Sequence, residues 1–191
     1  MSKMQSIKVV AEIGINHDGN RDICTKLIDG AAYAGCDLIK FQYRNLNRAY
    51  ASSKEIGDEI LSKEIKRCYL SPSDMIYLTN YGHGKNLEVG ISFFHVDDIH
   101  DLKDNLDDFD FFKVPSPEMN NHSLIDELLN LGKKVLCSTG AHSQSDINSL
   151  INKYKGNNQF IPMHCVSNYP LEDFNSIIGY VTFLKNLWGG K

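Results

Sequence analysis

The chain has 191 residues, of which 42% are hydrophobic, so its length and composition suit one domain with a core of ordinary size. Its 20 Lys and Arg residues against 24 Asp and Glu residues give a net charge of −4 without a basic run, which argues against nucleic-acid or membrane-surface partners. The 5 cysteines are scattered without a CxxC pair, and the N-terminal residues lack a signal-peptide core or a membrane span, so we expect a cytoplasmic protein with reduced thiols.

Short apolar runs alternate with helix-period segments along the chain, which is the pattern of βα units around a parallel sheet. A strand over residues 7–15 leads into a helix from about Asn20, whose apolar positions recur at helical spacing until Gly35. A second strand is predicted over residues 37–42. The polar stretch over residues 44–70 is interpreted as a long βα loop with room for a short helix.

The segment Ser71–Asp74 carries three signals of a helix start: an N-cap serine, a proline at the first helical position and an acid three residues after the cap. Gly82 and Gly84 are predicted to end this helix. The remaining predicted strands cover residues 88–94, 111–115, 134–138 and 160–166. The remaining predicted helices cover residues 96–106, 122–132, 143–155 and 175–187.

Two architectures fit a regular βα order, an open doubly wound sheet and a closed eight-stranded barrel, and both place their sites at the carboxyl ends of strands. A dinucleotide site in an open sheet requires Gly-x-Gly-x-x-Gly after the first strand, whereas residues 14–19 read Gly-Ile-Asn-His-Asp-Gly. The predicted fold class is therefore α/β, with a TIM (β/α)8 barrel favoured.

Polar residues occur at the carboxyl end of each predicted strand in turn. In strand order they are Glu12, Asn16 and His17; Lys40 and Gln42; Ser92 and His95; Lys113, Ser116 and Glu118; Ser138 and Thr139; and His164, Ser167, Asn168 and Tyr169. Such a ring is typical of the mouth of a barrel, where catalytic residues come from the ends of several strands. The candidate site is therefore placed at this end of the sheet.

Lys40 and Lys113 each lie inside an apolar strand, where an unpaired ammonium would be costly to bury. Three interpretations remain open: an ion pair with an inward carboxylate such as Glu12 or Glu118, a clamp for a phosphate or carboxylate ligand, and a Schiff-base amine. The clamp is favoured, because phosphate binds best to several charge-assisted donors and serine hydroxyls follow the same strands. These hydroxyls belong to Ser92, Ser116 and Ser138.

Other ionisable residues near the strand ends give weaker signals. Glu12 and Glu118 could act as general acid or base, or form salt bridges. His17 and His164 lack an HxH or HExxH spacing, so a structural or substrate-contacting role is favoured over metal binding. The acidic stretch over residues 96–110 lacks the glycine and spacing of a calcium loop and is interpreted as a solvated helix with its exit loop.

At these residues the chain resembles the N-acetylneuraminate (sialic acid) synthase family, which includes the legionaminate and pseudaminate synthases. The resemblance extends over essentially the whole chain, because the order and spacing of the matching strings agree with the family. The strings are AEIGINHDGN (11–20), IKFQ (39–42), FFKVPSPE (111–118), LCSTG (136–140) and HCVSNYP (164–170).

The resemblance implies a metal-dependent barrel that condenses phosphoenolpyruvate with an N-acetylmannosamine-type sugar, forming a nonulosonic acid and releasing phosphate. By position, the residues that match the phosphoenolpyruvate contacts are Lys40, Ser92, Lys113, Ser116 and Ser138. Those that match residues near the sugar or the reacting carbons are Glu12, Gln42, Glu118 and Tyr169. Ser167 stands where some members carry Asn. Glu12 and Glu118 are the expected catalytic residues, and the segment 44–70 is expected to help set sugar specificity.

The family's Gly-Tyr-Ser-Asp-His type motif, which supplies a histidine to the divalent metal (manganese or magnesium), does not occur in these 191 residues, and neither does the antifreeze-like domain. The expectation is therefore a partial barrel that ends after the sixth βα unit, contains no metal site, and is a homo-oligomer or is completed by another chain. The alternatives are a noncatalytic homologue that binds anions or a partner chain, and a Schiff-base aldolase that uses Lys40 or Lys113.

Overall fold

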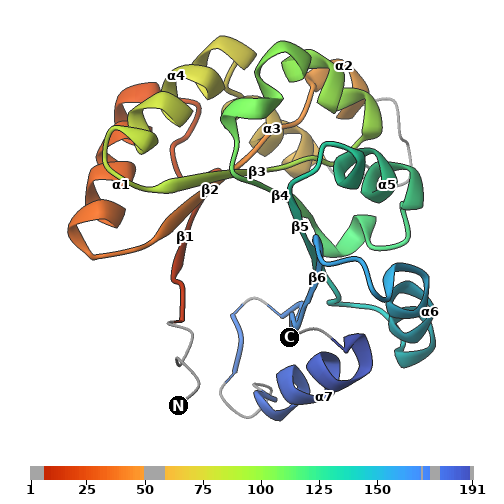
Figure 1. Cartoon of the computed structure of the whole chain (residues 1–191). Coiled ribbons are helices and arrows are strands. Elements are labelled where there is room, and N and C mark those ends of the chain that lie inside the picture. Colours follow the sequence, from red (N-terminus) through yellow and green to blue (C-terminus); the bar gives the residue numbers. More distant parts are fainter. Residues whose placement is uncertain (1–6, 50–58, 169, 173–176, 190–191) are drawn as a thin grey trace. The chain divides into compact units, whose positions relative to one another are not determined.

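The computed structural model describes residues 7–49, 59–168, 170–172 and 177–189. The chain divides into two compact units, with the boundary between Asp110 and Phe111. Each unit contains parallel strands with helices packed against them (Figure 1). None of the described helices has the length and apolar character needed to cross a membrane.

The first unit is built on three parallel strands that pair in chain order. The strands are β1 (Val10–Gly14), β2 (Leu38–Gln42) and β3 (Glu88–Ser92). The helices are α1 (Arg21–Tyr33), α2 (Leu46–Ala49), α3 (Glu59–Arg67), α4 (Pro72–His83) and the 3-10 helix η1 (Val96–Asp108). Helices α1 and α4 pack side by side, with α1 against β1 and α4 against β3 (Figure 1).

The second unit repeats this plan with three further parallel strands in chain order. The strands are β4 (Phe111–Val114), β5 (Lys134–Ser138) and β6 (Phe160–Met163). The helices are η2 (Ser116–Glu118), α5 (His122–Asn130), α6 (Gln144–Tyr154) and α7 (Gly179–Trp188). Helix α5 packs on β4 and β5, and α7 contacts both α6 and β6.

Helix α4 begins as its sequence predicts, because Ser71 and Asp74 form a capping box. The predicted helix end is confirmed at Gly84, which is the C-cap, but Gly82 lies inside α4, which continues to His83. Gly82 has a packing role instead. A Cβ at Gly82 would lie 2.8 Å from Val89 Cγ2 and 2.9 Å from Ile39 Cδ1, so glycine is what allows α4 to approach the sheet this closely.

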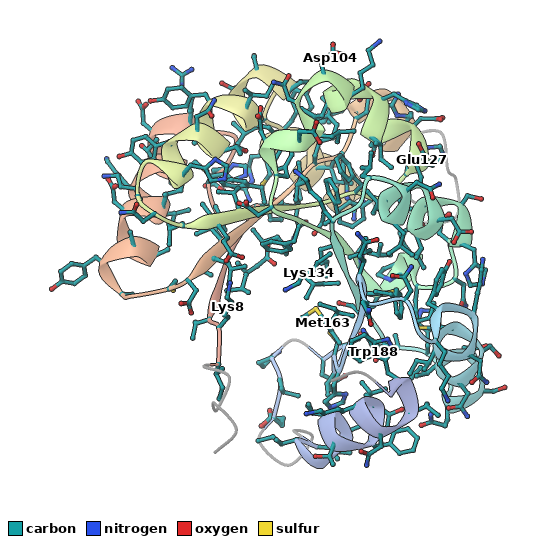
Figure 2. The ribbon with its side chains drawn as sticks, viewed as in Figure 1. Lys8, Asp104, Glu127, Lys134, Met163 and Trp188 are labelled. Carbon is teal, nitrogen blue, oxygen red and sulfur yellow. The ribbon has the colours of Figure 1, made fainter. Side chains whose placement is uncertain are left out.

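The alternation of side chains along the strands decides which residues face away from the helices. In the first unit Ile39 contacts α4 at Gly82, so its neighbour Lys40 points to the opposite face of the sheet. In the second unit the Phe160 ring stacks on Tyr154 of α6 at a centroid distance of 4.7 Å. The strand register then places Lys113, Leu136, Ser138 and Met163 on the opposite face, where Met163 is labelled in Figure 2.

The predicted βα alternation with parallel strands is confirmed in both units. The segment 44–70, interpreted as a long loop with room for a short helix, carries two helices, α2 and α3, within its described residues. The helix predicted from residue 96 is a 3-10 helix, consistent with its many aspartates, which compete with regular α-helical hydrogen bonds. The final helix starts at Gly179, and residues 175 and 176 of the predicted helix lie outside the described part of the chain. Closure into an eight-stranded barrel remains a prediction.

Candidate active site

A row of polar side chains follows the strands of the first unit on the face away from α4. Glu12 and Lys40 are register partners on β1 and β2, and the Lys40 ammonium lies 2.7 Å from Glu12 Oε2. The same ammonium donates a hydrogen bond of 2.8 Å to Ser92 Oγ at the end of β3. Lys40 is only 5% exposed, whereas the Glu12 side chain is 50% exposed. The ion pair considered for Lys40 from the sequence is therefore present, and its carboxylate is open to solvent.

Gln42 joins this row at the carboxyl end of β2, where it is the register partner of Ser92. The pairing of β1 with β2 is irregular between Glu12 and Gly14, and Gly14 adopts a φ of 53°. A Cβ at Gly14 would lie 2.8 Å from Glu12 Oε1 and 3.3 Å from Gln42 Nε2. Both polar side chains thus converge over a position that only glycine fits, and their membership of one functional site stays a prediction.

His17 is fully buried in the turn that follows β1. Its Nδ1 accepts a hydrogen bond of 3.1 Å from the Gly19 N–H, and its Nε2 lies 3.1 Å from the Gly14 carbonyl oxygen. An imidazole that accepts at Nδ1 and donates at Nε2 is neutral. Burial lowers the pKa of His17, which agrees with that form. Of the two roles expected for this histidine, the geometry fits the structural one.

In the second unit, serine hydroxyls gather around the backbone of Gly140, just after β5. The Gly140 N–H donates to Ser116 Oγ at 3.2 Å. A Cβ at Gly140 would lie 2.4 Å from Ser167 Oγ and 2.9 Å from Ser116 Oγ, so both hydroxyls lie against this glycine. His142 Nε2 lies 2.7 Å from the Ser116 carbonyl oxygen and fixes that turn of backbone. Serine hydroxyls that converge in this way can donate to an anionic ligand.

Ser138 and Lys113 lie on the same face of the second sheet as Met163. Ser138 is 3% exposed, and its Oγ accepts a contact of 3.2 Å from the Cys165 thiol. Lys113 is half-buried near Cys137. Burial raises the pKa of Cys137 to about 12, and the Lys113 ammonium opposes this rise. Lys113 and Ser138 thus bring an amine and a hydroxyl to the same face of the second sheet.

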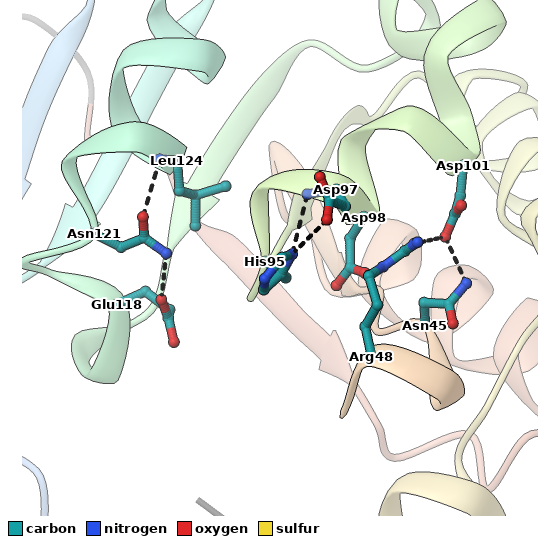
Figure 3. A network of polar contacts seen from close by, with 9 residues as sticks. All are labelled: Asn45, Arg48, His95, Asp97, Asp98, Asp101, Glu118, Asn121 and Leu124. Atoms are coloured by element: carbon teal, nitrogen blue, oxygen red, sulfur yellow. Dashed lines mark hydrogen bonds and ion pairs between the residues drawn. The ribbon is translucent and has the colours of Figure 1, made fainter. Parts of the chain in front are cut away.

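Glu118 is the last residue of the short helix η2, and a neighbouring side chain holds its carboxylate in place. Its Oε2 accepts a hydrogen bond of 2.8 Å from Asn121 Nδ2 (Figure 3). Asn121 in turn caps α5 by accepting a hydrogen bond of 3.1 Å from the Leu124 N–H. The helix cap thus orients this carboxylate. The predicted site residue Tyr169 lies outside the described residues.

His164 is the residue to consider as a metal ligand, because its Nε2 is buried and has no hydrogen-bond partner. Its ring packs 4.9 Å from that of Tyr180, measured between centroids. A buried imidazole nitrogen without a partner suits a metal ligand, and the sequence had favoured a structural or substrate-contacting role instead. The described residues nevertheless include no group of three or more His, Cys, Asp and Glu side chains that could hold a metal ion. They therefore supply a single candidate ligand and not a complete metal site.

An ion-pair network in the first unit was missed by sequence reasoning. The Arg48 guanidinium pairs with Asp98 Oδ1 at 2.7 Å and also with Asp101 (Figure 3). Asn45 Nδ2 donates to Asp101 Oδ2 at 2.8 Å, and Asp98 is only 2% exposed. Burial raises the pKa of Asp98, although the Arg48 guanidinium counteracts this. The interpretation of residues 96–110 as a solvated helix is therefore wrong at Asp98, which anchors the segment after β2.

Comparison with known proteins gives a consistent set of relatives. The NeuB family model matches residues 27–189. N-acetylneuraminate-9-phosphate synthase of Drosophila melanogaster is 27% identical over 190 residues, which cover 95% of this chain and 51% of that protein. Spore coat polysaccharide biosynthesis protein SpsE of Bacillus subtilis is 30% identical, with 89% of this chain and 47% of that protein covered.

Solved structures agree with the sequence relatives. The crystal structure of N-acetylneuraminic acid (sialic acid) synthetase from Leptospira borgpetersenii, in complex with citrate, matches with a TM-score of 0.83 and 25% identity. The match covers 97% of this chain and 65% of that one. The chain spans about half the length of the curated relatives that it matches.

Proposed function

The chain belongs to the NeuB family, and we propose that it provides the phosphoenolpyruvate site of a synthase that makes a nonulosonic acid. The acceptor would be an N-acetylmannosamine-type sugar, and phosphate would be released. The observation that carries this proposal is Lys40, an almost fully buried ammonium with a half-exposed carboxylate partner, at the carboxyl end of the strands. The relatives named as N-acetylneuraminate-9-phosphate and N,N'-diacetyllegionaminic acid synthases support the reaction class.

Phosphoenolpyruvate carries a phosphate and a carboxylate, and both units offer groups for such anions. We assign Lys40 and Ser92 of the first unit to one set of contacts, because their hydrogen bond of 2.8 Å already orders the ammonium. Lys113, Ser116, Ser138 and Ser167 of the second unit form the other set. Charge-assisted hydrogen bonds to a dianion are stronger than neutral ones, and fixed donors bind without reorganisation.

In the proposed reaction, C3 of phosphoenolpyruvate forms a bond to the aldehyde carbon of the open-chain sugar. Water adds at C2, and the bond from C2 to the phosphate oxygen breaks as phosphate leaves. One proton of the attacking water must be removed and one must reach the former aldehyde oxygen, and the second proton of that water passes to the leaving phosphate as the C2 carbonyl forms. We assign these transfers to Glu12 and Glu118, and Gln42 to a sugar hydroxyl beside Glu12, because carboxylates fixed near a reacting centre act as general acids and bases.

Manganese or magnesium, when bound to the longer family proteins, would polarise the aldehyde oxygen. His164 is the described residue suited to contribute a ligand, and the rest of the metal site is proposed to come from outside the described residues. The Schiff-base alternative is weaker for Lys40, because an ammonium held by a carboxylate and a hydroxyl is not a free amine. The noncatalytic alternative keeps the anion site but predicts no turnover by the full-length protein.

We also propose a cytoplasmic location and an assembly in which further polypeptide covers strand β1. Val9 and Val10 are 53% and 42% exposed beside and within this strand. Among the described residues of its unit, β1 pairs with β2 alone, so its other edge is open to a strand from the seventh and eighth βα units, another chain or a second copy.

The proposal is tested by thermal unfolding of the chain with phosphoenolpyruvate at millimolar concentration. A ligand that binds the native state raises the melting temperature as its concentration rises. The double variant Lys40→Ala, Lys113→Ala should lose this shift, whereas Lys85→Ala, which removes an exposed lysine paired with Asp29, should keep it. An absent shift, or an equal shift in the double variant, would rule out the proposed anion site.

A further inference from the structure

The turn over residues 139–143, between β5 and α6, holds Ser116 at two points. The Gly140 N–H donates a hydrogen bond of 3.2 Å to Ser116 Oγ, and His142 Nε2 lies 2.7 Å from the Ser116 carbonyl oxygen. A carbonyl oxygen only accepts hydrogen bonds, so His142 Nε2 carries a hydrogen and donates it. Both the side chain and the backbone of Ser116 are thus fixed from one turn of the same unit.

The first of these contacts sets the direction in which the Ser116 hydroxyl can donate. A serine hydroxyl has one O–H donor and two acceptor lone pairs. Because Ser116 Oγ accepts from the Gly140 N–H, its own hydrogen is turned away from that amide and is available to another acceptor. The O–H is therefore aligned before a ligand binds, and a prealigned donor stabilises a negative charge without reorganisation.

The residue between the two contacts has a strained backbone. Ala141 adopts a φ of 59°, in the left-handed region, where the Cβ of an L-residue comes too close to the following carbonyl oxygen. Strain of this kind persists only where the surrounding contacts over-determine the backbone, and it is concentrated at functional sites. In this turn the determining contacts are those that Gly140 and His142 make with Ser116.

Both ends of the turn are anchored independently of Ser116. The N–H and the hydroxyl of Thr139 donate to the Met163 carbonyl oxygen of β6, at 3.1 and 2.9 Å. At the other end, Ser143 and Asp146 form a capping box at the start of α6. His142 therefore reaches Ser116 from a fixed frame.

The helix η2, which begins at Ser116, gives this residue little support of its own. It has three residues, and its N-cap Pro115 makes no side-chain capping hydrogen bond. The Met119 N–H donates to the Ser116 carbonyl oxygen at 3.1 Å, and the same oxygen accepts the shorter bond of 2.7 Å from His142. Because 3-10 hydrogen bonds have poorer geometry than α-helical ones, the bond from His142 decides how firmly Ser116 is held.

We propose that His142 is a positioning residue, which keeps the Ser116 hydroxyl in the orientation that donates to an anionic ligand. His142 acts through the backbone of Ser116 and is not itself a contact of the ligand. The proposal rests on the proposed function, since it takes Ser116 as one of the groups that bind phosphoenolpyruvate. It adds a residue that none of the local sequence signals marked as part of the site.

The test is a double-mutant cycle, measured by calorimetric titration of the 191-residue chain with phosphoenolpyruvate. Ser116→Ala removes the donor and should weaken binding by about tenfold or more, as expected for a hydrogen bond to a charged group. His142→Ala should weaken binding by about three- to tenfold. In the Ser116→Ala background the same change should cost less than about twofold, because no hydroxyl is left to position.

Two further variants separate positioning from a general effect of losing a histidine. His142→Gln should recover most of the affinity, because its amide can donate to the same carbonyl oxygen. His122→Ala is the matched control. His122 is a half-buried histidine of the same unit that lies 3.3 Å from the Tyr154 hydroxyl, and its loss should leave phosphoenolpyruvate binding unchanged.

A second measurement needs no ligand. In His142→Ala the Gly140 N–H should exchange with solvent faster than in the wild type, because its acceptor on Ser116 is held less firmly. The Gln159 N–H, which donates to Asn157 Oδ1 at 2.9 Å in the same unit, should exchange at an unchanged rate. Nuclear magnetic resonance measures both amides.

Three results would each overturn the inference and leave the proposed phosphoenolpyruvate site in place. They are wild-type affinity of His142→Ala, an equal loss of affinity in the two backgrounds, and unchanged exchange of the Gly140 N–H. If the wild type did not bind phosphoenolpyruvate, the proposed function would be wrong, and the inference would fall with it.

Discussion

The first unit places an ion pair between a buried lysine and a half-exposed glutamate on its strands, whereas the second unit gathers serine hydroxyls around a glycine. Within this unit the Lys40 ammonium pairs with the Glu12 carboxylate and donates a hydrogen bond to Ser92. At position 140 the packing leaves no room for a side chain, because the hydroxyls of Ser116 and Ser167 lie where a Cβ would be. The first arrangement should therefore be sensitive to a change of charge, and the second to a change of volume.

Neutralising Glu12 should have the largest effect on stability. Glu12→Gln leaves the Lys40 ammonium buried without its carboxylate, and removing one partner of a buried ion pair costs about 3–5 kcal/mol. We expect the lower end of this range, since Glu12 is half exposed and Ser92 remains as a hydrogen-bond acceptor. Urea unfolding measures the change in the free energy of unfolding.

The control for this experiment is the double variant Lys40→Met, Glu12→Gln, which removes both charges. It should be more stable than Glu12→Gln alone, because no unpaired ammonium is left in the sheet. If the single and double variants had equal free energies of unfolding, the unpaired Lys40 ammonium would not be the cause of the lost stability.

A methyl group at Gly140 should have a smaller but clear effect. In Gly140→Ala the new Cβ would crowd Ser167 Oγ, Ser116 Oγ and the Cys165 carbonyl oxygen, and overpacking typically costs about 1–3 kcal/mol. It should also weaken the stabilisation by phosphoenolpyruvate, because the serine hydroxyls must move apart.

The matched control is Gly179→Ala in the same unit, where a Cβ meets no atom within 4 Å. At the start of α7 this substitution should be neutral or stabilise by up to about 1 kcal/mol. Denaturant unfolding of both variants gives the comparison. Equal effects at the two glycines would show that the second unit does not depend on the space around Gly140.

The smallest predicted effect concerns pH and His17. Burial lowers the pKa of this histidine, so the imidazole binds a proton more weakly in the folded chain than in the unfolded chain. Its contribution to stability is complete above about pH 6.5, the ordinary pKa of histidine, and is lost as the pH falls below that value toward the folded pKa.

The measurement is the free energy of unfolding against pH for the wild type and for His17→Gln, whose amide can replace both hydrogen bonds of the neutral ring. The wild type should lose more stability than the variant below pH 6.5, by about 1.4 kcal/mol for each unit by which the pKa is lowered. Parallel curves would mean that His17 is not held neutral.

The strand positions and the polar strand ends could be predicted because they depend on local patterns. Lys40 was conspicuous as a charge inside an apolar strand, and its partner Glu12 was among the carboxylates considered. The capping box at Ser71 could be predicted for the same reason, since all its signals lie within four residues.

What sequence reasoning missed depends on contacts between distant residues. Arg48 and Asp98 are 50 residues apart, and nothing local marks either as a buried partner. Gly82 carried the local signal of a helix end, but its contacts with Ile39 and Val89 explain its presence inside α4. The contact of His142 with Ser116 has the same origin, because the two residues are 26 apart in the sequence.

The turn that holds His17 has a consequence for building chimeras. Because any side chain in place of Gly19 would run into the carbonyl oxygen of Arg67, the turn over residues 14–19 and the end of α3 form one interlocked module. Grafting the segment 44–70 from a relative with another preference would import a new α3 against an unchanged turn. Chimeras that exchange the turn over residues 14–19 together with the segment 44–70 should fold. Chimeras that exchange only one of these two segments should be destabilised by the mismatch between Gly19 and the end of α3.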